Sequence, residues 1–167
     1  MELVNNQSIF FSKTKENAII PSKRKEDGAY DIYSCFEDEY IIIKPQEVQS
    51  IPTGIASAFN SKYRIVFQER GSTGIVGLKI NAGLIDSGFR GEWFVLLNNT
   101  TNKTVIISKT IQKTEQVNGV IFYPYKKAIC QAKVQEVPEV EIVEIPYDEL
   151  LEINSERGIG ALGSSNK

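Results

Sequence analysis

The chain has 167 residues, 41% of them hydrophobic and 24% charged, and its net charge is −2. That length suits one domain, and the composition is that of a globular protein, so a wholly disordered chain, a collagen and a disulfide-rich scaffold are excluded. No apolar run approaches the roughly 20 residues of a membrane helix, and the first residues lack the basic end and apolar core of a signal peptide. We therefore expect a cytoplasmic protein, in a bacterium or a phage-infected cell, without a membrane partner.

Short β-strands are the main expectation along the chain. Apolar, β-branched and aromatic runs bounded by turn residues favour strands at residues 40–43, 54–59, 63–67, 93–97, 104–108, 120–122 and 128–134. A short helix is expected around residues 76–78. Residues 140–145 alternate acidic and apolar side chains, as a half-exposed strand does. Strands of this length, spaced by roughly 8–12 residues, indicate a β-sandwich or barrel.

Two segments differ from this pattern. Residues 98–119 are longer than a plain hairpin connection, which indicates an added ribbon or an insertion. Residues 154–167 are rich in glycine and serine and carry little to bury, which is typical of a flexible terminus. We therefore expect a β domain at residues 1–153 and a flexible C-terminal arm at residues 154–167.

The absence of histidine excludes several mechanisms. A Ser-His-Asp triad, a Cys-His dyad and a His-ligated zinc site cannot form, so any general base is a carboxylate, lysine, tyrosine or cysteine. Cys35 and Cys130 lie far apart in the sequence, and we interpret them as reduced thiols. The mild acidity argues against a nucleic-acid partner, and the basic cluster at residues 23–25 is interpreted as a solvated loop.

Five polar or glycine-rich islands interrupt the strands. They lie at residues 27–34, 69–74, 83–92, 125–131 and 157–165. The second, Glu-Arg-Gly-Ser-Thr-Gly, offers a fixed cation, two hydroxyls and backbone N–H groups of the kind that bind anions, and the fifth repeats this chemistry around Arg157. Two such islands favour a polyphosphate ligand, although neither is a Walker A loop or a Rossmann turn. In the third island, Asp86 places a carboxylate where a strand enters a turn.

In this order, the five islands resemble the five motifs of the homotrimeric dUTPases (deoxyuridine triphosphate nucleotidohydrolases), over residues 21–165. The third, Gly-Leu-Ile-Asp-Ser-Gly-Phe-Arg-Gly-Glu, is similar to the family's G-[VL]-I-D-x-x-[YF]-x-G. The second resembles a variant of P-R-S-[GS], and the fifth resembles the C-terminal R-G-x-G-G-F-G-S-[TS] arm. The resemblance implies an all-β, jelly-roll-like distorted barrel, a homotrimer, and a flexible C-terminal arm that closes over a neighbouring site.

The resemblance also implies a reaction. In the family, water attacks the α-phosphorus of dUTP and releases dUMP and pyrophosphate, with Mg²⁺ bridging the phosphate oxygens. This activity limits uracil incorporation into DNA and supplies dUMP. Asp86 matches the carboxylate that orients and deprotonates the water, which agrees with a chain that has no histidine. Because the motifs meet from several subunits, the trimer is part of the mechanism.

Further roles are implied for residues that stand at the positions of the family's motif residues. Phosphate binding is implied for Arg70, Gly71, Ser72, Thr73, Gln131, Arg157, Gly163, Ser164 and Ser165. Nucleoside binding is implied for Asn81, Gly83, Leu84, Ile85, Phe89 and Leu162. Asp31 matches the aspartate near the metal, in an indirect role, because Mg²⁺ is held mainly by the substrate phosphates.

Several residues depart from the family pattern. Leu162 stands where the family often has a phenylalanine, Glu69 replaces a proline, and Lys126-Lys127 replaces a Gly-Asp-Arg step. The second motif is shifted by one position, which leaves open whether Ser72 or Thr73 contacts the bridging oxygen between the α- and β-phosphates.

Four other functions are considered as alternatives. A dCTP deaminase is disfavoured because Leu96 stands where that enzyme has a glutamate. A pyrimidine hydrolase that also accepts dCTP stays open. So does a phage-type regulator that binds a protein partner in a nucleotide-dependent way, for which residues 98–119 are the candidate surface. A plain β-sandwich binding module is the least specific reading.

Overall fold

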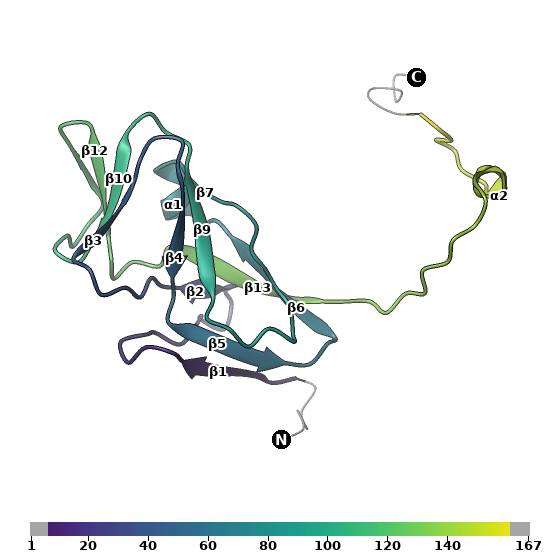
Figure 1. The fold of residues 1–167 in the computed structure, drawn as a ribbon, viewed down its shortest axis with the longest axis horizontal. Helices are drawn as coiled ribbons and strands as arrows, with labels where there is room; N and C mark the ends of the chain where they lie inside the picture. The colour runs from purple at the N-terminus through teal and green to yellow at the C-terminus, as the bar shows by residue number, and fades with distance from the viewer. Residues whose placement is uncertain (1–6, 161–167) are drawn as a thin grey trace.

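A computed structural model gives the fold, and it describes residues 7–160. Almost all regular structure in this range is β, as expected (Figure 1). The strands are β1 (Ile9–Lys13), β2 (Tyr30–Ile32), β3 (Tyr40–Ile43), β4 (Val48–Pro52), β5 (Ile55–Phe59), β6 (Tyr63–Gln68), β7 (Leu78–Ile80), β8 (Leu84–Ile85), β9 (Phe94–Asn99), β10 (Thr104–Ser108), β11 (Glu115–Val117), β12 (Val120–Pro124) and β13 (Cys130–Glu136). Two short helices are α1 (Gly71–Ile75) and α2 (Tyr147–Glu152).

The strands form four small sheets that wrap around one core. Their orders are β2-β13-β6-β8, β4-β9-β7, β11-β12-β10-β3 and β1-β5. β10 and β12 pair in parallel, whereas the other strand pairs within residues 7–160 are antiparallel. The β2-β13-β6-β8 sheet matters most for function, because it carries parts of four of the five islands or leads directly into them.

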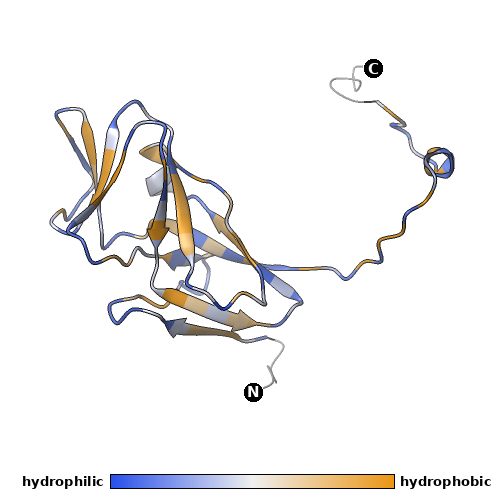
Figure 2. Cartoon of the chain, in the orientation of Figure 1, coloured by the Kyte–Doolittle hydropathy of each residue, from blue (hydrophilic) through white to orange (hydrophobic). Residues whose placement is uncertain are grey.

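The core explains why these residues form strands. β9 alternates buried and more exposed residues, so Val95 and Leu97 point inward, as one face of a strand requires. Trp93 is fully buried, and the rings of Phe11 and Phe67 meet it edge-on at centroid distances of 5.3 and 5.6 Å. β5 and β9 are largely hydrophobic, whereas β2 and β13 also carry hydrophilic residues (Figure 2).

The predicted helix around residues 76–78 is wrong. The helix lies earlier, at α1, and Leu78 already belongs to β7, where it pairs with Asn99 and is fully buried. Gly77, with a φ of +80°, separates the two elements. The local sequence is compatible with a helix or a strand at these residues. The pairing of β7 with β9 makes Leu78 part of a strand.

The predicted strand at residues 140–145 is also absent. This segment has no regular structure, and its apolar side chains point into solvent, with Ile142 94% exposed and Val140 73% exposed. The chain leaves the barrel after β13 and runs outward as an extended segment that carries α2 (Figure 1). Acid–apolar alternation is therefore present without any strand partner among residues 7–160.

Residues 98–119 hold the end of β9 and the strands β10 and β11, which belong to the β11-β12-β10-β3 sheet. After β10, the chain turns back through β11, and Asn118 and Gly119, with φ values of 49° and 79°, join β11 to β12 in a tight hairpin. The ends differ from the expectation, because Asn98 and Asn99 still belong to β9.

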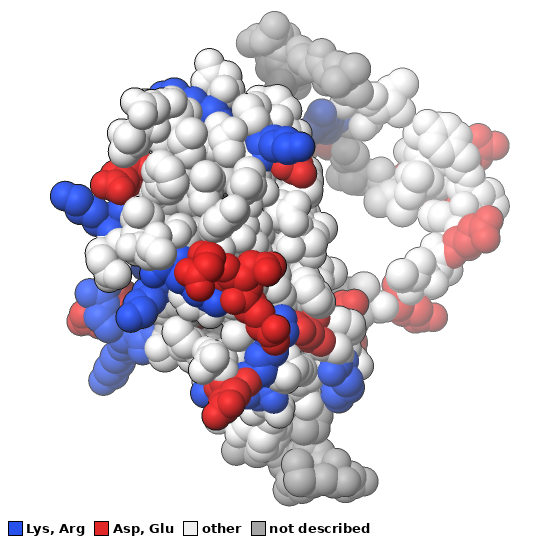
Figure 3. Space-filling model, turned by 60° about the vertical axis from the view of Figure 1, so that its left-hand side comes forward, with Lys and Arg blue, Asp and Glu red and all other residues white. Residues whose placement is uncertain are grey.

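Both cysteines are buried free thiols, as expected. No helix within residues 7–160 is long and apolar enough to span a membrane. Lysine and arginine side chains intermingle with acidic ones on the face drawn in Figure 3, with the C-terminal segment behind. That segment, residues 137–153, contains six acidic residues and no lysine or arginine.

Candidate active site

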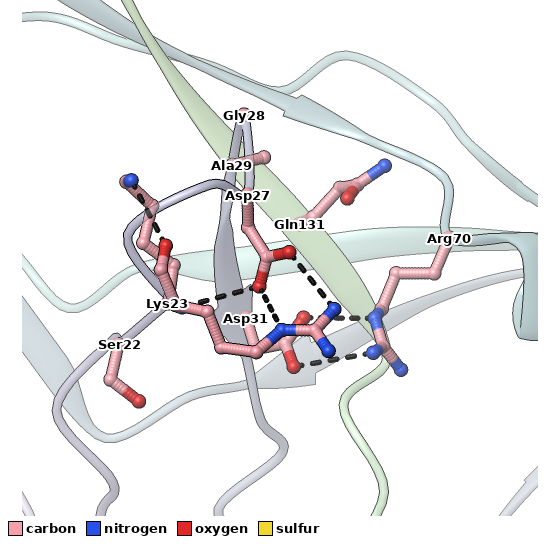
Figure 4. A pocket seen from close by; sticks show the side chains of 9 residues that line it. Ser22, Lys23, Asp27, Gly28, Ala29, Asp31, Arg70 and Gln131 are labelled. Atoms are coloured by element: carbon pink, nitrogen blue, oxygen red, sulfur yellow. Dashed lines mark hydrogen bonds and ion pairs between the residues drawn. The ribbon is translucent and has the colours of Figure 1, made fainter.

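Strand register brings three of the predicted site residues together. In the central sheet, Gln131 on β13 lies opposite Asp31 on β2 and Gln68 on β6. Arg70 follows β6 by two residues, so its side chain reaches the same end of the sheet (Figure 4). These groups line a cavity of about 600 Å³ whose walls are Ser22, Lys23, Arg24, Asp27, Gly28, Ala29, Asp31, Arg70 and Gln131.

Arg70 is held in this cavity by Asp31. Its Nε lies 2.9 Å from Oδ1 and its Nη2 lies 3.2 Å from Oδ2, a two-point ion pair. Gln131 is fixed as well, because its Nε2 donates to the backbone oxygen of Glu69 at 2.8 Å. The cavity therefore presents an oriented guanidinium and an anchored amide, the chemistry that binds phosphate oxygens.

The structure separates the roles of Ser72 and Thr73. Thr73 is fully buried, and its hydroxyl accepts the Arg70 backbone N–H and donates to the Arg70 carbonyl, both at 3.0 Å. This hydroxyl closes the N-terminus of α1, and its single proton is used there, so it has none to donate to a ligand. Ser72 is less buried, and its Oγ lies 3.4 Å from Arg70 Nη1 and 3.2 Å from the Tyr123 hydroxyl. Of these two hydroxyls, that of Ser72 is therefore the one that contacts the Arg70 side chain, which lines the cavity.

The basic cluster at residues 23–25 lies beside the cavity. The three residues are exposed, as a solvated loop would be, yet Lys23 and Arg24 form part of the cavity wall. Arg24 and Asp27 form a bidentate pair at 2.9 Å, and this hydrogen bonding lowers the pKa of Asp27. The only sequence signal for this placement is that the cluster directly precedes the first island.

A tight turn joins β7 to β8 at the position of the predicted nucleoside hairpin, although β7 pairs with β9 and β8 with β6 rather than with each other. Ala82 and Gly83 have φ values of 59° and 134°. The Asn81 N–H donates to the Leu96 oxygen at 2.9 Å, and the Gly83 oxygen accepts the Phe67 N–H at 2.8 Å. The side chains of the two β8 residues diverge, since Ile85 is buried and Leu84 is 54% exposed. For Ile85, only the backbone is available to a ligand.

Glu69 connects the phosphate cavity to this hairpin. Its Oε1 accepts the backbone N–H of Ile80, at the end of β7, at 3.0 Å. Hydrogen bonds from the backbone N–H groups of Ile80 and of Glu69 itself lower the pKa of the Glu69 carboxyl. The replacement of the family's proline by glutamate is therefore accommodated by a new contact.

Asp86 and Phe89 lie away from the phosphate cavity of the same chain. Both are exposed, and the Phe89 N–H donates to the backbone oxygen of Asp86 at 3.1 Å. β8 pairs antiparallel with β6, with Ile85 opposite Ile65, so the next step places Asp86 beside Arg64. Arg64 and Gln68 lie near opposite ends of β6, about 13 Å apart, and Arg70 lies two residues beyond Gln68. Asp86 and Arg70 of one chain therefore lie toward opposite ends of β6.

The fifth island is also separate from the cavity. Arg157 is exposed, and its Nε donates to the Gly160 oxygen at 2.8 Å, within a segment that lies away from the barrel (Figure 1). The other predicted residues of this island lie outside the described residues; these are Leu162, Gly163, Ser164 and Ser165.

The residues offer no protein-only metal cage. No group of three or more acidic or cysteine side chains within residues 7–160 is arranged to hold a metal ion. Both oxygens of the Asp31 carboxylate already contact Arg70. A magnesium ion at this cavity would need most of its oxygen ligands from elsewhere.

Comparison with known proteins identifies the family. The dUTPase family model matches residues 15–145. The chain is 33% identical to the deoxyuridine 5'-triphosphate nucleotidohydrolase of Nautilia profundicola over 160 residues, which cover 93% of this chain and 96% of that one. The chain belongs to the dUTPase family. Its identity to the nucleotidohydrolase of Mycolicibacterium gilvum is 32%, over 87% of this chain and 86% of the relative.

Solved dUTPase structures share the fold. The dUTPase of Staphylococcus bacteriophage 80alpha with dUPNHPP matches with a TM-score of 0.71 over 96% of this chain and 99% of that one, at 24% identity. This likeness confirms the jelly-roll-like, all-β fold that the dUTPase resemblance implied.

Proposed function

We propose that this dUTPase-family chain hydrolyses dUTP to dUMP and pyrophosphate, and so limits uracil incorporation into DNA and supplies dUMP. The cavity formed by Arg70, Asp31 and Gln131, with the Ser72 hydroxyl in contact with Arg70, is the observation that carries the proposal. It combines a fixed cation, an amide and a hydroxyl, as a triphosphate site requires. The curated relatives that match most of the chain are deoxyuridine 5'-triphosphate nucleotidohydrolases.

The chemistry follows from these groups. Asp86 takes a proton from a water molecule whose oxygen attacks the α-phosphorus, and the bond from that phosphorus to the bridging oxygen breaks as pyrophosphate leaves. Arg70 offsets the charge on the phosphate oxygens, and Ser72 donates to the bridging oxygen as negative charge develops there. Gln131, Gly71 and Thr73 shape the phosphate side, the last two through the backbone and the cap of α1.

Selection of the nucleoside belongs to the hairpin. The backbone of Asn81, Gly83, Leu84 and Ile85 hydrogen-bonds uracil, and a narrow turn has no room for the methyl group of thymine. The exposed Phe89 ring packs under the deoxyribose, where it offers no partner to a 2′-hydroxyl. Leu162 of the arm covers the base with less contact than an aromatic ring would give.

The active unit is a homotrimer in which each site uses several chains. The placement of Asp86 and Arg70 toward opposite ends of β6 supports this, since it favours a site that takes the two groups from different chains. So does the exposed apolar face of the C-terminal segment, which includes Ile142, Leu150 and Leu151 and needs a surface to cover it. Each arm then brings Arg157, Gly163, Ser164 and Ser165 to the phosphates of a neighbouring site.

We expect magnesium to bind together with the substrate phosphates. A mutant dUTPase from phage phi11 of S. aureus, 19% identical with a TM-score of 0.65, coordinates a structural Mg(II) ion. In this chain the phosphate oxygens would supply most of the Mg²⁺ ligands, and the ion would offset phosphate charge. Asp31 acts indirectly, by orienting Arg70.

Pyrophosphate release tests the proposal directly. Release is measured from dUTP, dCTP, dTTP and UTP with Mg²⁺, for the wild-type protein, for Asp86→Asn and for Asp38→Asn, which removes an exposed carboxylate elsewhere. We expect turnover of dUTP alone, with kcat lowered by about 10²–10⁴-fold in Asp86→Asn and unchanged in Asp38→Asn. Comparable turnover of dCTP would indicate the broader pyrimidine hydrolase, and binding without turnover would favour the regulator.

A further inference from the structure

We propose that Tyr123 is a positioning residue for the reaction, because its hydroxyl fixes the side chain of Ser72 in the orientation that serves the phosphates. This inference rests on the proposed function, and it concerns a residue of β12 that belongs to none of the five islands. Tyr123 is fully buried, and its hydroxyl lies between two oxygens. One is the backbone oxygen of Ala128 at 2.7 Å, and the other is Ser72 Oγ at 3.2 Å.

The direction of these two hydrogen bonds is fixed by chemistry. A backbone carbonyl can only accept, so the single Tyr123 proton goes to Ala128. Burial raises the pKa of the Tyr123 hydroxyl, so this proton stays in place at neutral pH. The contact with Ser72 must then run the other way, with the Ser72 hydroxyl donating to the Tyr123 oxygen.

This arrangement defines the resting state of Ser72. Its one proton points toward Tyr123, and its oxygen accepts from Arg70 Nη1 at 3.4 Å. A serine in the first turn of a helix otherwise tends to hydrogen-bond to nearby backbone groups. The Tyr123 oxygen competes with that option and keeps the Ser72 oxygen beside Arg70. Thr73 cannot replace it, because its hydroxyl is used within α1.

Lys127 and the neighbouring strands hold the Tyr123 ring in place. Lys127 Nζ lies 5.2 Å from the centre of the Tyr123 ring and donates to Thr114 Oγ1 at 3.3 Å. Tyr123 also sits in a strand that pairs on both sides, with β10 and β11. A ring fixed in this way provides a stationary acceptor, whereas water would provide a mobile one.

The effect of Tyr123 on catalysis depends on the stage of the reaction at which Ser72 donates its hydrogen bond. The charge on the bridging oxygen grows as the bond to the α-phosphorus breaks, so a Ser72 donor is worth more in the transition state than in the ground state. When substrate arrives, the Ser72 proton turns from Tyr123 to the bridging oxygen, and the Tyr123 proton turns from Ala128 to Ser72 Oγ, so that Oγ keeps its place and its hydrogen bond to Tyr123. Loss of the Tyr123 hydroxyl should therefore lower kcat and leave KM nearly unchanged.

A double-mutant cycle tests this inference. We expect Tyr123→Phe to lower kcat for dUTP by about tenfold with KM within about twofold, the size of one lost hydrogen bond. In a Ser72→Ala background, Tyr123→Phe should have no further effect on kcat, because the residue through which it acts is gone. Tyr63→Phe is the matched control, since Tyr63 lies on β6, outside the five islands.

The outcomes separate this inference from the proposed function. Equal losses of kcat from Tyr123→Phe with and without Ser72, or no loss at all, would overturn the positioning role. Denaturation midpoints of all four proteins are measured alongside, because Tyr123→Phe also leaves the Ala128 carbonyl without its donor. If the midpoint fell but kcat per folded molecule did not, the hydroxyl would be structural only. Failure of the wild-type protein to hydrolyse dUTP would instead refute the proposed function.

Discussion

Arg70, just before α1, and Asp31, on β2, meet in a two-point ion pair, with Nε–Oδ1 at 2.9 Å and Nη2–Oδ2 at 3.2 Å. The pair is about one-third exposed, with side-chain exposures of 29% for Arg70 and 32% for Asp31. Its contribution to the free energy of unfolding is therefore small, at about 1 kcal/mol or less. Its main consequence is geometric, because a guanidinium gripped at two points keeps one plane.

Asp31→Asn should weaken turnover more than it weakens the fold. Asparagine keeps the shape of the side chain but loses the charge and one acceptor, so Arg70 is no longer held flat against β2. We expect kcat/KM for dUTP to fall about tenfold and the free energy of unfolding to change by less than about 1 kcal/mol. Steady-state kinetics and urea unfolding measure the two, with Asp38→Asn as the control. A rise in kcat/KM would mean that Asp31 restrains Arg70 rather than orients it.

Gly83→Ala should damage both the hairpin and the fold. At a φ of +134°, a β-carbon on residue 83 would lie 2.9 Å from Phe67 Cβ, so strain and a clash coincide. We expect a loss of about 1–3 kcal/mol in the free energy of unfolding, and a raised KM for dUTP. Gly119→Ala is a matched control, because residue 119 has a φ of +79° but nothing within 4 Å of the added carbon. Equal losses in the two variants would show that the contact with Phe67 carries no cost.

The sequence was most informative where a pattern depends on neighbours along the chain. β3 and β10 are runs of β-branched residues, and both strands were predicted with their observed bounds. The strand predicted at 140–145 failed because alternation shows that a segment can pair but not whether a partner exists in the same chain. β1 and β4 were missed, since their mixed sequences, IFFSK and VQSIP, carry no clear period.

The candidate site also contains residues that the sequence predicted and one that it did not. The motifs named Arg70, Asp31 and Gln131, and β-sheet register brings these three to one cavity. Nothing in the sequence marks Tyr123, because a tyrosine in an apolar strand looks like any core residue until its hydroxyl is seen to face Ser72. Contacts between distant segments depend on three-dimensional packing, which local spacing does not encode.

Glu69 should make stability depend on pH in the acid range. Its pKa is lowered in the folded protein, chiefly by the Ile80 N–H, so the unfolded chain binds a proton at higher pH than the folded one. The stabilisation is therefore complete above the ordinary pKa of 4.5 and is lost as the pH falls through the folded-state value. We expect Glu69→Gln, which cannot ionise, to flatten this part of the curve of Tm against pH.

The matched control is Glu136→Gln, at the exposed end of β13. Thermal unfolding of the three proteins from pH 7 down to pH 3 supplies the comparison. If the wild-type protein and Glu69→Gln lost stability in parallel over this range, the hydrogen bond to Ile80 would not be the source of the acid sensitivity.

Sites shared between chains should be recoverable by mixing two inactive proteins. One chain carries Asp86→Asn with its arm intact, and the other ends at residue 153 with Asp86 intact. If Asp86 and the arm of one site come from different chains, random trimers restore both groups in about a quarter of sites. We expect activity to return after co-refolding, measured as pyrophosphate release from dUTP, with trimer mass checked by light scattering. A mixture in which the truncated chain also carries Asp86→Asn should stay inactive. Activity no greater than the sum of the two separate proteins would place the arm and Asp86 of each site in one chain, which contradicts the shared-site trimer.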